Sequence, residues 1–330
     1  MTGPVPAEWS PHRAMWVGFP SHAALWEDDL NPAQDEVAAL ALALAGAGGE
    51  QVKLLACGDG VTAASDRLSG TPGIEIIPAD FGDIWLRDTG PIFLAPGTAA
   101  AFAFNGWGGK YRLAGDETVA DQIAAAAGAD LVRHTFVLEG GALDHDGEGA
   151  CLTTRQCLTN PNRNRAWREG DAELALADAL GVRKVIWLGD GLVNDHTDGH
   201  VDNLARFVAP GVVCCPMAFG ADDPHAVAYD RAAAILANST DAAGRRLTLV
   251  RVPSPGRIID ADHRSVPASH MNFLIANRAV IVPLYNERAG EMAMEALEMQ
   301  FRSHSVIGLS ARSLVNGGGG FHCISQQEPA

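Results

Sequence analysis

The chain has 330 residues, 47% hydrophobic and 19% charged, a composition typical of a soluble globular protein of one or two domains. Its 24 basic and 40 acidic residues give a formal net charge of −16, which disfavours nucleic acid and anionic membranes as partners and is compatible with a cationic substrate. No stretch is apolar enough to span a bilayer, and several prolines near the start argue against a secretory signal. The six cysteines lack the density and spacing of a disulfide framework or a zinc knuckle, so we expect a cytoplasmic protein.

One pattern recurs along the chain: a stretch with helical periodicity, a short apolar strand, then a loop that carries polar residues. The five predicted helix-and-strand pairs are 37–45 with 52–56, 119–127 with 132–138, 173–180 with 184–188, 229–236 with 247–252, and 292–301 with 306–309. Further strands are predicted at 92–94, 100–104, 204–208 and 273–282.

This repeat favours an α/β fold in which mixed units form a closed array and each buries its apolar face against its neighbours. An open doubly wound sheet is the alternative, but no G-x-G-x-x-G motif opens a helix after the first strand. The glycines at 317–320 are not followed by Gly-Lys-Ser/Thr, so the phosphate-binding loop is also missing. Because no linker or low-complexity segment divides the chain, we expect residues 1–330 to form a single domain.

The residues able to do chemistry follow predicted strands and come from different units. They are Asp88, Glu139, His200 with Asp202, and Cys323, which follows the glycine run. Loops at one end of a radial scaffold would converge on its axis, so a shared site is expected. The order His-Val-Asp predicts that His200 and Asp202 project the same way from a strand.

Several acids, a tryptophan and a thiol suit a guanidinium group. That cation is planar, carboxylates can meet its donors two at a time, and the indole of Trp85, three residues before Asp88, can stack on it. The guanidinium carbon is a poor electrophile, so attack requires a thiolate and a group that protonates the departing amine. His200 is the candidate for this acid and base role.

The sequence resembles the agmatine deiminase family, which groups with the bacterial-type peptidylarginine deiminases in the guanidino-group-modifying superfamily. The resemblance covers essentially the whole chain and is carried by these motifs: P-A-E-W-S-P-H (6–12), M-W-V-G-F-P (15–20), G-D-I-W-L-R-D-T-G-P (82–91), F-N-G-W-G-G-K-Y (104–111), L-E-G-G (138–141), T-N-P-N-R-N (159–164), T-D-G-H-V-D-N (197–203), S-H-M-N-F (269–273) and H-C-I-S-Q-Q-E-P (322–329).

The resemblance implies a five-bladed, pseudo-symmetric α/β propeller of ββαβ-type units, the pentein-like fold. It implies deimination of a small cationic guanidino substrate without metal or organic cofactor: agmatine and water would give N-carbamoylputrescine and ammonia through an amidino-thioether on Cys323. The roles that it implies are acid and base for His200, guanidinium binding for Asp88 and Asp202, and a position in the pocket wall for Glu139 and Trp85. Asn272 and Trp107 match further residues near the substrate. A homodimer is compatible with this fold, although no stretch identifies an interface.

One departure concerns the substrate. Agmatine deiminases usually carry an acid four residues before the catalytic histidine, where it helps to hold the distal amine, and here that position is His196. A histidine is a poorer partner for an ammonium group. Deimination of another guanidine, such as free or terminal arginine or an alkylguanidine, is therefore the alternative.

Two readings of other classes remain. In a metallohydrolase, His196 and His200, four apart, would bind a metal with Asp198 and Asp202, but Cys323 would then have no task. A propeller of the same fold could also bind a cationic ligand without turning it over. Chelator resistance together with sensitivity to thiol alkylation separates the first reading from deimination, and an ammonia-release assay separates the second.

Overall fold

Each repeat of the chain is an antiparallel pair of strands, a helix, and a third strand parallel to the second. The computed structural model describes residues 3–330. Four units follow the chain order: β4 (Ile92–Ala95), β5 (Thr98–Ala103), α6 (Val119–Ala127) and β6 (Asp130–Val137); β7 (Asp144–His145), β8 (Ala150–Thr154), α8 (Glu169–Leu180) and β9 (Lys184–Leu188); β10 (Arg206–Ala209), β11 (Val212–Met217), α9 (Ala226–Ala237) and β12 (Thr248–Pro253); β13 (Leu274–Ile275), β14 (Ala279–Leu284), α10 (Glu287–Glu298) and β15 (Ser305–Ser310).

The remaining unit is assembled from both ends of the chain. Its sheet has the order β16-β1-β2-β3, formed by β16 (Ser325–Pro329), β1 (His12–Gly18), β2 (Val52–Ala56) and β3 (Ile74–Pro78), with α2 (Leu30–Ala45) and α3 (Asp59–Leu68) as crossovers. Met15 pairs with Gln327 of β16 in antiparallel register and with Val52 of β2 in parallel register. The indole of Trp16 also donates a 3.0 Å hydrogen bond to Glu328, so the ring of units is closed by side chains as well as by the backbone.

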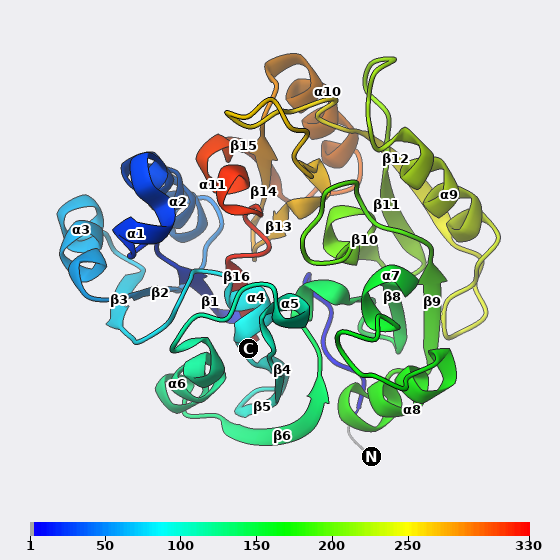
Figure 1. Ribbon diagram of the computed structural model, residues 1–330, viewed down its shortest axis with the longest axis horizontal. Coiled ribbons are helices and arrows are strands. Elements are labelled where there is room, and N and C mark those ends of the chain that lie inside the picture. Colours follow the sequence, from blue (N-terminus) through cyan, green and yellow to red (C-terminus); the bar gives the residue numbers. More distant parts are fainter. Residues whose placement is uncertain (1–2) are drawn as a thin grey trace.

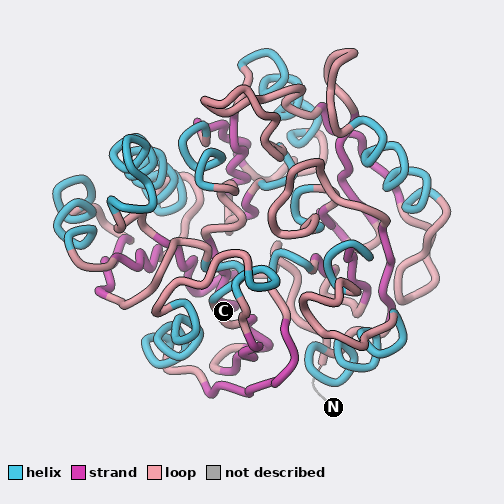
Figure 2. The backbone as a smooth tube through the Cα atoms, in the orientation of Figure 1, coloured by secondary structure: helices cyan, strands magenta, loops and turns pink. Residues whose placement is uncertain are grey.

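The five sheets are arranged radially, with the long helices around the outside (Figure 1). The same view coloured by secondary structure shows strands inside the ring of helices and mostly loops and short helices near the centre (Figure 2). The fold is therefore the five-bladed α/β propeller that the family resemblance implied. No helix within residues 3–330 is both long enough and apolar enough to cross a membrane.

Short elements follow the third strand of four units and turn the chain toward the axis. They are α4 (Leu86–Thr89), η3 (Gly140–Ala142), η4 (Val201–Asn203) and η5 (His270–Asn272); after the unit that ends in β15, α11 (Arg312–Gly317) and the loop 318–324 lead to β16. The other short helices are α1 (Ala23–Trp26), η1 (Glu27–Asp29), α5 (Gly106–Gly109), η2 (Asp116–Thr118) and α7 (Arg155–Leu158).

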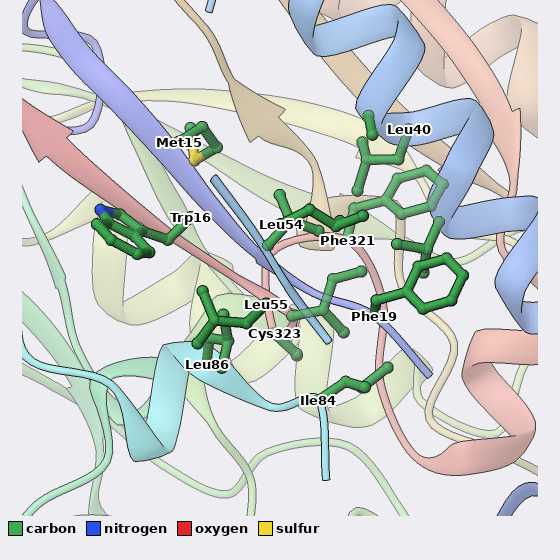
Figure 3. Packing of buried hydrophobic residues seen from close by; sticks show 14 of the residues in the cluster. Met15, Trp16, Phe19, Leu40, Leu54, Leu55, Ile84, Leu86, Phe321 and Cys323 are labelled. Carbon is green, nitrogen blue, oxygen red and sulfur yellow. The ribbon is translucent and has the colours of Figure 1, made fainter. Parts of the chain in front are cut away.

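The apolar core holds the loop 318–324, which carries Cys323. In α2, Val37, Leu40, Ala41 and Leu44 recur at helical spacing and are fully buried against the sheet. Figure 3 shows Cys323 at the edge of the same cluster, close to side chains of β2 and α4. Packing against this core fixes the backbone on one side of Cys323.

The sequence predicted the bounds of α6, β2 and β9 at both ends. It predicted the other paired helices and strands with errors of a few residues at their ends, except that it missed the first seven residues of α2. Two predictions are wrong. Residues 273–282 are not one strand, because β13 and β14 form a hairpin whose turn is closed by a hydrogen bond from the amide of Ala276 to the carbonyl of Ala279. His200 and Asp202 do not lie on a strand, because Val201–Asn203 forms a 3-10 helix.

Candidate active site

A cavity of about 290 Å³ opens among the central loops. It is lined by Leu25, Trp26, Asp83, Trp85, Asp88, Trp107, Tyr111, Leu113, His196, Thr197, Asn316, Gly317, Gly318 and Cys323. Carboxylates and one thiol are therefore in reach of a ligand that is otherwise surrounded by indole rings.

Glycines allow the loop before β16 to bring Cys323 to this cavity. Gly318 has a φ of +120°, which side chains rarely adopt. A Cβ on Gly319 would lie 2.6 Å from the ring of Trp85 and 3.2 Å from Sγ of Cys323. The glycine run of the sequence therefore permits the close packing of the thiol against Trp85.

Asp88, His200 and Asp202 converge on one point, the α-carbon of Gly141. A Cβ on that glycine would lie 2.5 Å from Nδ1 of His200, 2.9 Å from Oδ1 of Asp88 and 3.2 Å from Oδ2 of Asp202. Sγ of Cys323 is 3.6 Å from the same Oδ2 of Asp202, and Nδ1 of His200 is 3.7 Å from Oδ1 of Asp88. The four side chains thus form one cluster, although they come from three loops.

Asp88 and Asp202 accept hydrogen bonds from different donors, and each carboxylate can accept further hydrogen bonds from a ligand. The amide of Gly141 donates to Oδ1 of Asp88 at 3.0 Å, and the indole of Trp107 donates to its Oδ2 at 2.9 Å. Oδ2 of Asp202 accepts a 2.8 Å hydrogen bond from Nδ1 of His322, whereas its buried Oδ1 has no partner among residues 3–330. An unpartnered carboxylate oxygen beside a thiol suits a ligand that brings N–H donors.

Burial and neighbouring charges set the protonation states of the site residues before a ligand binds. Desolvation, reinforced by Asp202 and Asp88, raises the pKa of Cys323 well above its ordinary value, so the sulfur rests as a thiol. Desolvation also raises the pKa of Asp88, against the opposing effect of His200. For His200, burial lowers the pKa, but Asp88 first, followed by Cys157 and Glu139, outweighs it and raises the pKa well above the ordinary value. A ligand cation would compensate the carboxylates and favour the thiolate.

Glu139 does not line the cavity as expected. It lies behind His200, where its Oε1 accepts a 2.7 Å bond from Nε of the buried Arg163. The same guanidinium donates to Asp198 at 2.6 Å and to the carbonyl of Thr197 at 2.8 Å. Glu139 therefore ties the loop that carries His200 to the rest of the protein, in addition to raising the pKa of His200.

The tryptophans act as donors as well as walls. The rings of Trp26 and Trp85 stack with centroids 6.2 Å apart, and their indole N–H groups donate to the two oxygens of Asp83 at 3.0 and 2.8 Å. Desolvation raises the pKa of Asp83, although these bonds oppose it. The arrangement holds both indoles in place in the cavity wall.

His196 also lines the cavity, beside the same glycine run. Its Nε2 would be 2.4 Å from a Cβ on Gly318, and its ring meets Tyr111 edge-on at 5.8 Å. The main-chain carbonyl of His196 accepts a 2.7 Å bond from Lys110, which also pairs with Asp198 at 2.6 Å. Lys110 and Arg163 thereby compensate the charge of Asp198.

The set proposed for a metallohydrolase does not come together. Within residues 3–330, one group has three donor atoms within 4.8 Å of one another, and it consists of Glu139, Cys157 and His200. It includes neither His196 nor Asp198, and Arg163 already occupies one oxygen of Glu139.

The structure brings the sequence-predicted Cys323, Asp88, Trp85, Trp107 and His196 to the cavity wall, with His200, Asp202 and Asn272 directly behind it. Sequence reasoning missed Arg163, Asp83, Trp26, Tyr111 and His322 as members of the site. Arg163, Asp83, Tyr111 and His322 lie inside motifs that carried the family resemblance, but the residues alone gave no sign of their partners.

Comparison with known proteins agrees with this arrangement. The family model for Porphyromonas-type peptidyl-arginine deiminase matches residues 4–329. The chain is 36% identical over 353 residues to the agmatine deiminase of Stutzerimonas stutzeri, covering 99% of this chain and 95% of that one. It is 35% identical over 353 residues to the agmatine deiminase of Pseudomonas aeruginosa strain LESB58, with the same coverage.

Solved structures give the same result. The agmatine deiminase of Enterococcus faecalis superposes with a TM-score of 0.93 at 31% identity, covering 99% of this chain and 96% of that one. A C. jejuni agmatine deiminase variant solved with bound substrate has a TM-score of 0.89 at 26% identity, with the same coverage. An amidinotransferase from Microseira wollei, at 12% identity and a TM-score of 0.59 over 99% of this chain and 97% of that one, shares the fold alone.

Fold and comparisons together define the class: this is an α/β propeller of the guanidino-group-modifying enzymes. Within that class, the chain belongs to the Porphyromonas-type peptidyl-arginine deiminase family.

Proposed function

We propose that the protein is an agmatine deiminase, which hydrolyses agmatine to N-carbamoylputrescine and ammonia. The observation that carries the proposal is the cluster beside the indole-lined cavity, where two carboxylates and an imidazole meet around Gly141 and the thiol of Cys323 lies 3.6 Å from Asp202. The support from relatives is that curated agmatine deiminases align with 99% of the chain at about 35% identity.

The guanidinium group would lie between Asp88 and Asp202. Its N–H donors would fill the unpartnered Oδ1 of Asp202 and the remaining lone pairs of Asp88. The positive charge compensates both carboxylates, which lowers the pKa of Cys323 in the complex and lets the thiol ionise. The substrate itself thus helps to activate the nucleophile.

The reaction then has two halves. First, Cys323 loses its proton to solvent as the substrate binds, the S–C bond forms, a C–N bond breaks, and the imidazolium of His200 gives its proton to the departing ammonia. Second, the now neutral His200 takes one proton from water, the C–O bond forms, the C–S bond breaks, and the second proton of the water goes to the sulfur. The proton that Cys323 released in the first half converts ammonia to ammonium, so atoms and charge balance.

The other residues have supporting roles in this proposal. Glu139 adds to the effects of Asp88 and Cys157, which raise the pKa of His200 and so favour its imidazolium form. Trp85 and Trp107 flank the guanidinium plane. Asn272 donates to Sγ of Cys323 at 3.1 Å. His196 stands beside the distal part of the cavity, where the aminobutyl chain of agmatine would extend over the aromatic wall.

We also propose that residues 1–330 form one catalytic domain, because the site draws on loops from every unit. The cytoplasm is the proposed compartment, where a reducing environment keeps the six free cysteines as thiols. A homodimer stays a prediction that light scattering in solution can test.

A turnover panel tests the function. Agmatine, arginine, an arginyl peptide and a simple alkylguanidine are each incubated with the protein, and ammonia release is measured. We expect agmatine to have the highest kcat/KM, and Cys323→Ser to lose turnover by at least about a thousandfold while still binding agmatine by calorimetry. Ammonia release that persists in Cys323→Ser would refute the mechanism, and a higher kcat/KM for another guanidine would refute the substrate. Buried Cys215→Ser, in β11, is the matched control.

A further inference from the structure

His322, the residue before Cys323, lies on the far side of the loop from the main cavity. It lines a separate small cavity behind the site, about 20 Å³, together with Glu8, Arg87, Asp144, His145 and Gln327. Cys323 lines the main cavity instead. Because His322 and Cys323 are consecutive residues, the same loop separates the main cavity from a buried polar cluster around His322.

Both ring nitrogens of His322 face a carboxylate. Nδ1 is 2.8 Å from Oδ2 of Asp202, and Nε2 is 3.3 Å from Oε2 of Glu8, with all three side chains buried. A neutral imidazole has one N–H and one lone pair, so one of these contacts would set a lone pair against a carboxylate. Only the doubly protonated ring presents an N–H to each carboxylate.

The charges around His322 also favour a positive charge on its ring. Glu8 is also bonded to Arg206, which reaches Asp144 at 2.6 Å. Arg87 lies on the other side, and its Nε donates to the carbonyl of His322 at 3.3 Å. Burial, followed by Arg87, lowers the pKa of the neighbouring His145 to about 4, so that ring adds no charge.

The buried cluster thus contains three carboxylates, Glu8, Asp144 and Asp202, and two arginines, Arg87 and Arg206. A protonated His322 supplies the third positive charge and leaves the cluster neutral. An uncompensated charge in such a place would be costly.

We propose that His322 is a positioning residue of the deimination site, held as an imidazolium by Asp202 and Glu8. It occupies Oδ2 of Asp202 and so leaves Oδ1 free for the guanidinium, and its charge offsets Asp202 beside the sulfur of Cys323. The N-terminal segment that carries Glu8 is thereby part of the machinery. This inference rests on the proposed function, but its tests do not depend on turnover.

The first test is alkylation of Cys323 by neutral iodoacetamide as a function of pH, followed by mass spectrometry of the Cys323 peptide. His322→Asn keeps a donor near Asp202 but removes the charge and the contact with Glu8. We expect its alkylation at pH 7.5 to be about tenfold slower, with the profile moved up by about one pH unit. His12→Asn is the control, because Nδ1 of His12 also meets a buried carboxylate, Glu50, at 2.9 Å, whereas its Nε2 contacts only the main-chain carbonyl of Glu8, at 2.6 Å.

The profile of His12→Asn should match that of the wild type. A His322→Asn profile that superimposes on the wild-type profile would overturn the proposal, as would an equal shift in His12→Asn.

The second test uses the unmodified protein and is independent of how any variant folds. In ¹⁵N-histidine NMR at pH 7.5, we expect the ring of His322 to carry a proton on both nitrogens. A single protonated nitrogen would also overturn the proposal. If both tests succeed and no guanidine is turned over, the inference about the charge of His322 stands and the proposed function fails.

Discussion

The side-chain amide of Asn272 donates a hydrogen bond to Sγ of Cys323 at 3.1 Å, and its carbonyl oxygen accepts one from the main-chain amide of the same cysteine at 3.2 Å. Both contacts hold the sulfur toward the cavity. The amide lowers the pKa of Cys323, but desolvation and the two aspartates prevail and raise it. The nucleophile is therefore well oriented yet protonated before substrate arrives.

This charge state predicts how Cys323 responds to alkylating agents. Because the pKa of Cys323 is raised, the thiolate fraction is small at pH 7, and alkylation by neutral 2-chloroacetamide should increase with pH throughout the neutral range. The cationic 2-chloroacetamidine should react at least about tenfold faster at pH 7.5, because its charge compensates Asp88 and Asp202. Free glutathione provides the intrinsic ratio of the two reagents, and a protein ratio no larger than that would contradict the prediction.

A methyl group at Gly141 should damage catalysis without unfolding the protein. The new Cβ would lie 2.5 Å from His200 and 2.9 Å from Asp88, so the cluster must move apart. We expect kcat/KM of Gly141→Ala to fall by roughly a hundredfold, as misplaced catalytic groups commonly cause. The control is Gly170→Ala, in the first turn of α8, where a Cβ meets nothing within 4 Å and should leave activity unchanged. Equal activities of the two variants would show that the cluster is not the site.

Glu139→Gln should change the pH dependence of turnover. Glu139 is one of the groups that raise the pKa of His200, so its neutralisation lowers that pKa. The imidazolium needed to protonate the leaving nitrogen is then lost at a lower pH, and the alkaline limb of the kcat profile should move down by about one unit, or about tenfold in rate on that limb. Glu50→Gln, in a buried pair with His12, is the control and should leave the limb in place. An unmoved limb in Glu139→Gln would exclude this role.

His196→Glu tests how the distal end of the substrate is held. A carboxylate on this wall would face an alkylammonium group, so the ratio of kcat/KM for agmatine to that for a neutral alkylguanidine should rise by roughly tenfold, about 1.4 kcal/mol. His196→Gln controls for removal of the imidazole. If the ratio is the same in both variants, the amine does not approach position 196.

The sequence contained enough to predict the repeating units, because helical and strand periods are local signals. The residues of the cluster came from candidate chemistry together with the resemblance to a known family. The sequence could not show which distant side chains pair. Arg163 lies in a motif, but its bonds to Glu139 and Asp198 follow only from the folded loops. Glu8 and His322 are likewise far apart along the chain and meet at the axis.

The failure at residues 273–282 has a local cause. Every apolar residue in that run is compatible with a strand, and Asn277 and Arg278 gave too weak a turn signal to divide it. In the same way, the HVD run fits a strand by alternation, but Thr197 bonds the amide of His200 and starts a 3-10 turn instead.

The closure of the first sheet has a consequence for how the protein acquires activity. Trp16 and its partner Glu328 are 312 positions apart, so β1 meets β16 by closing a very long loop, which makes this a slow contact to form. The nucleophile sits directly before β16 and cannot be seated until that strand docks. Regain of enzymatic turnover after dilution from denaturant should therefore lag behind regain of helical circular dichroism, and the lag would measure the rate at which the propeller ring seals.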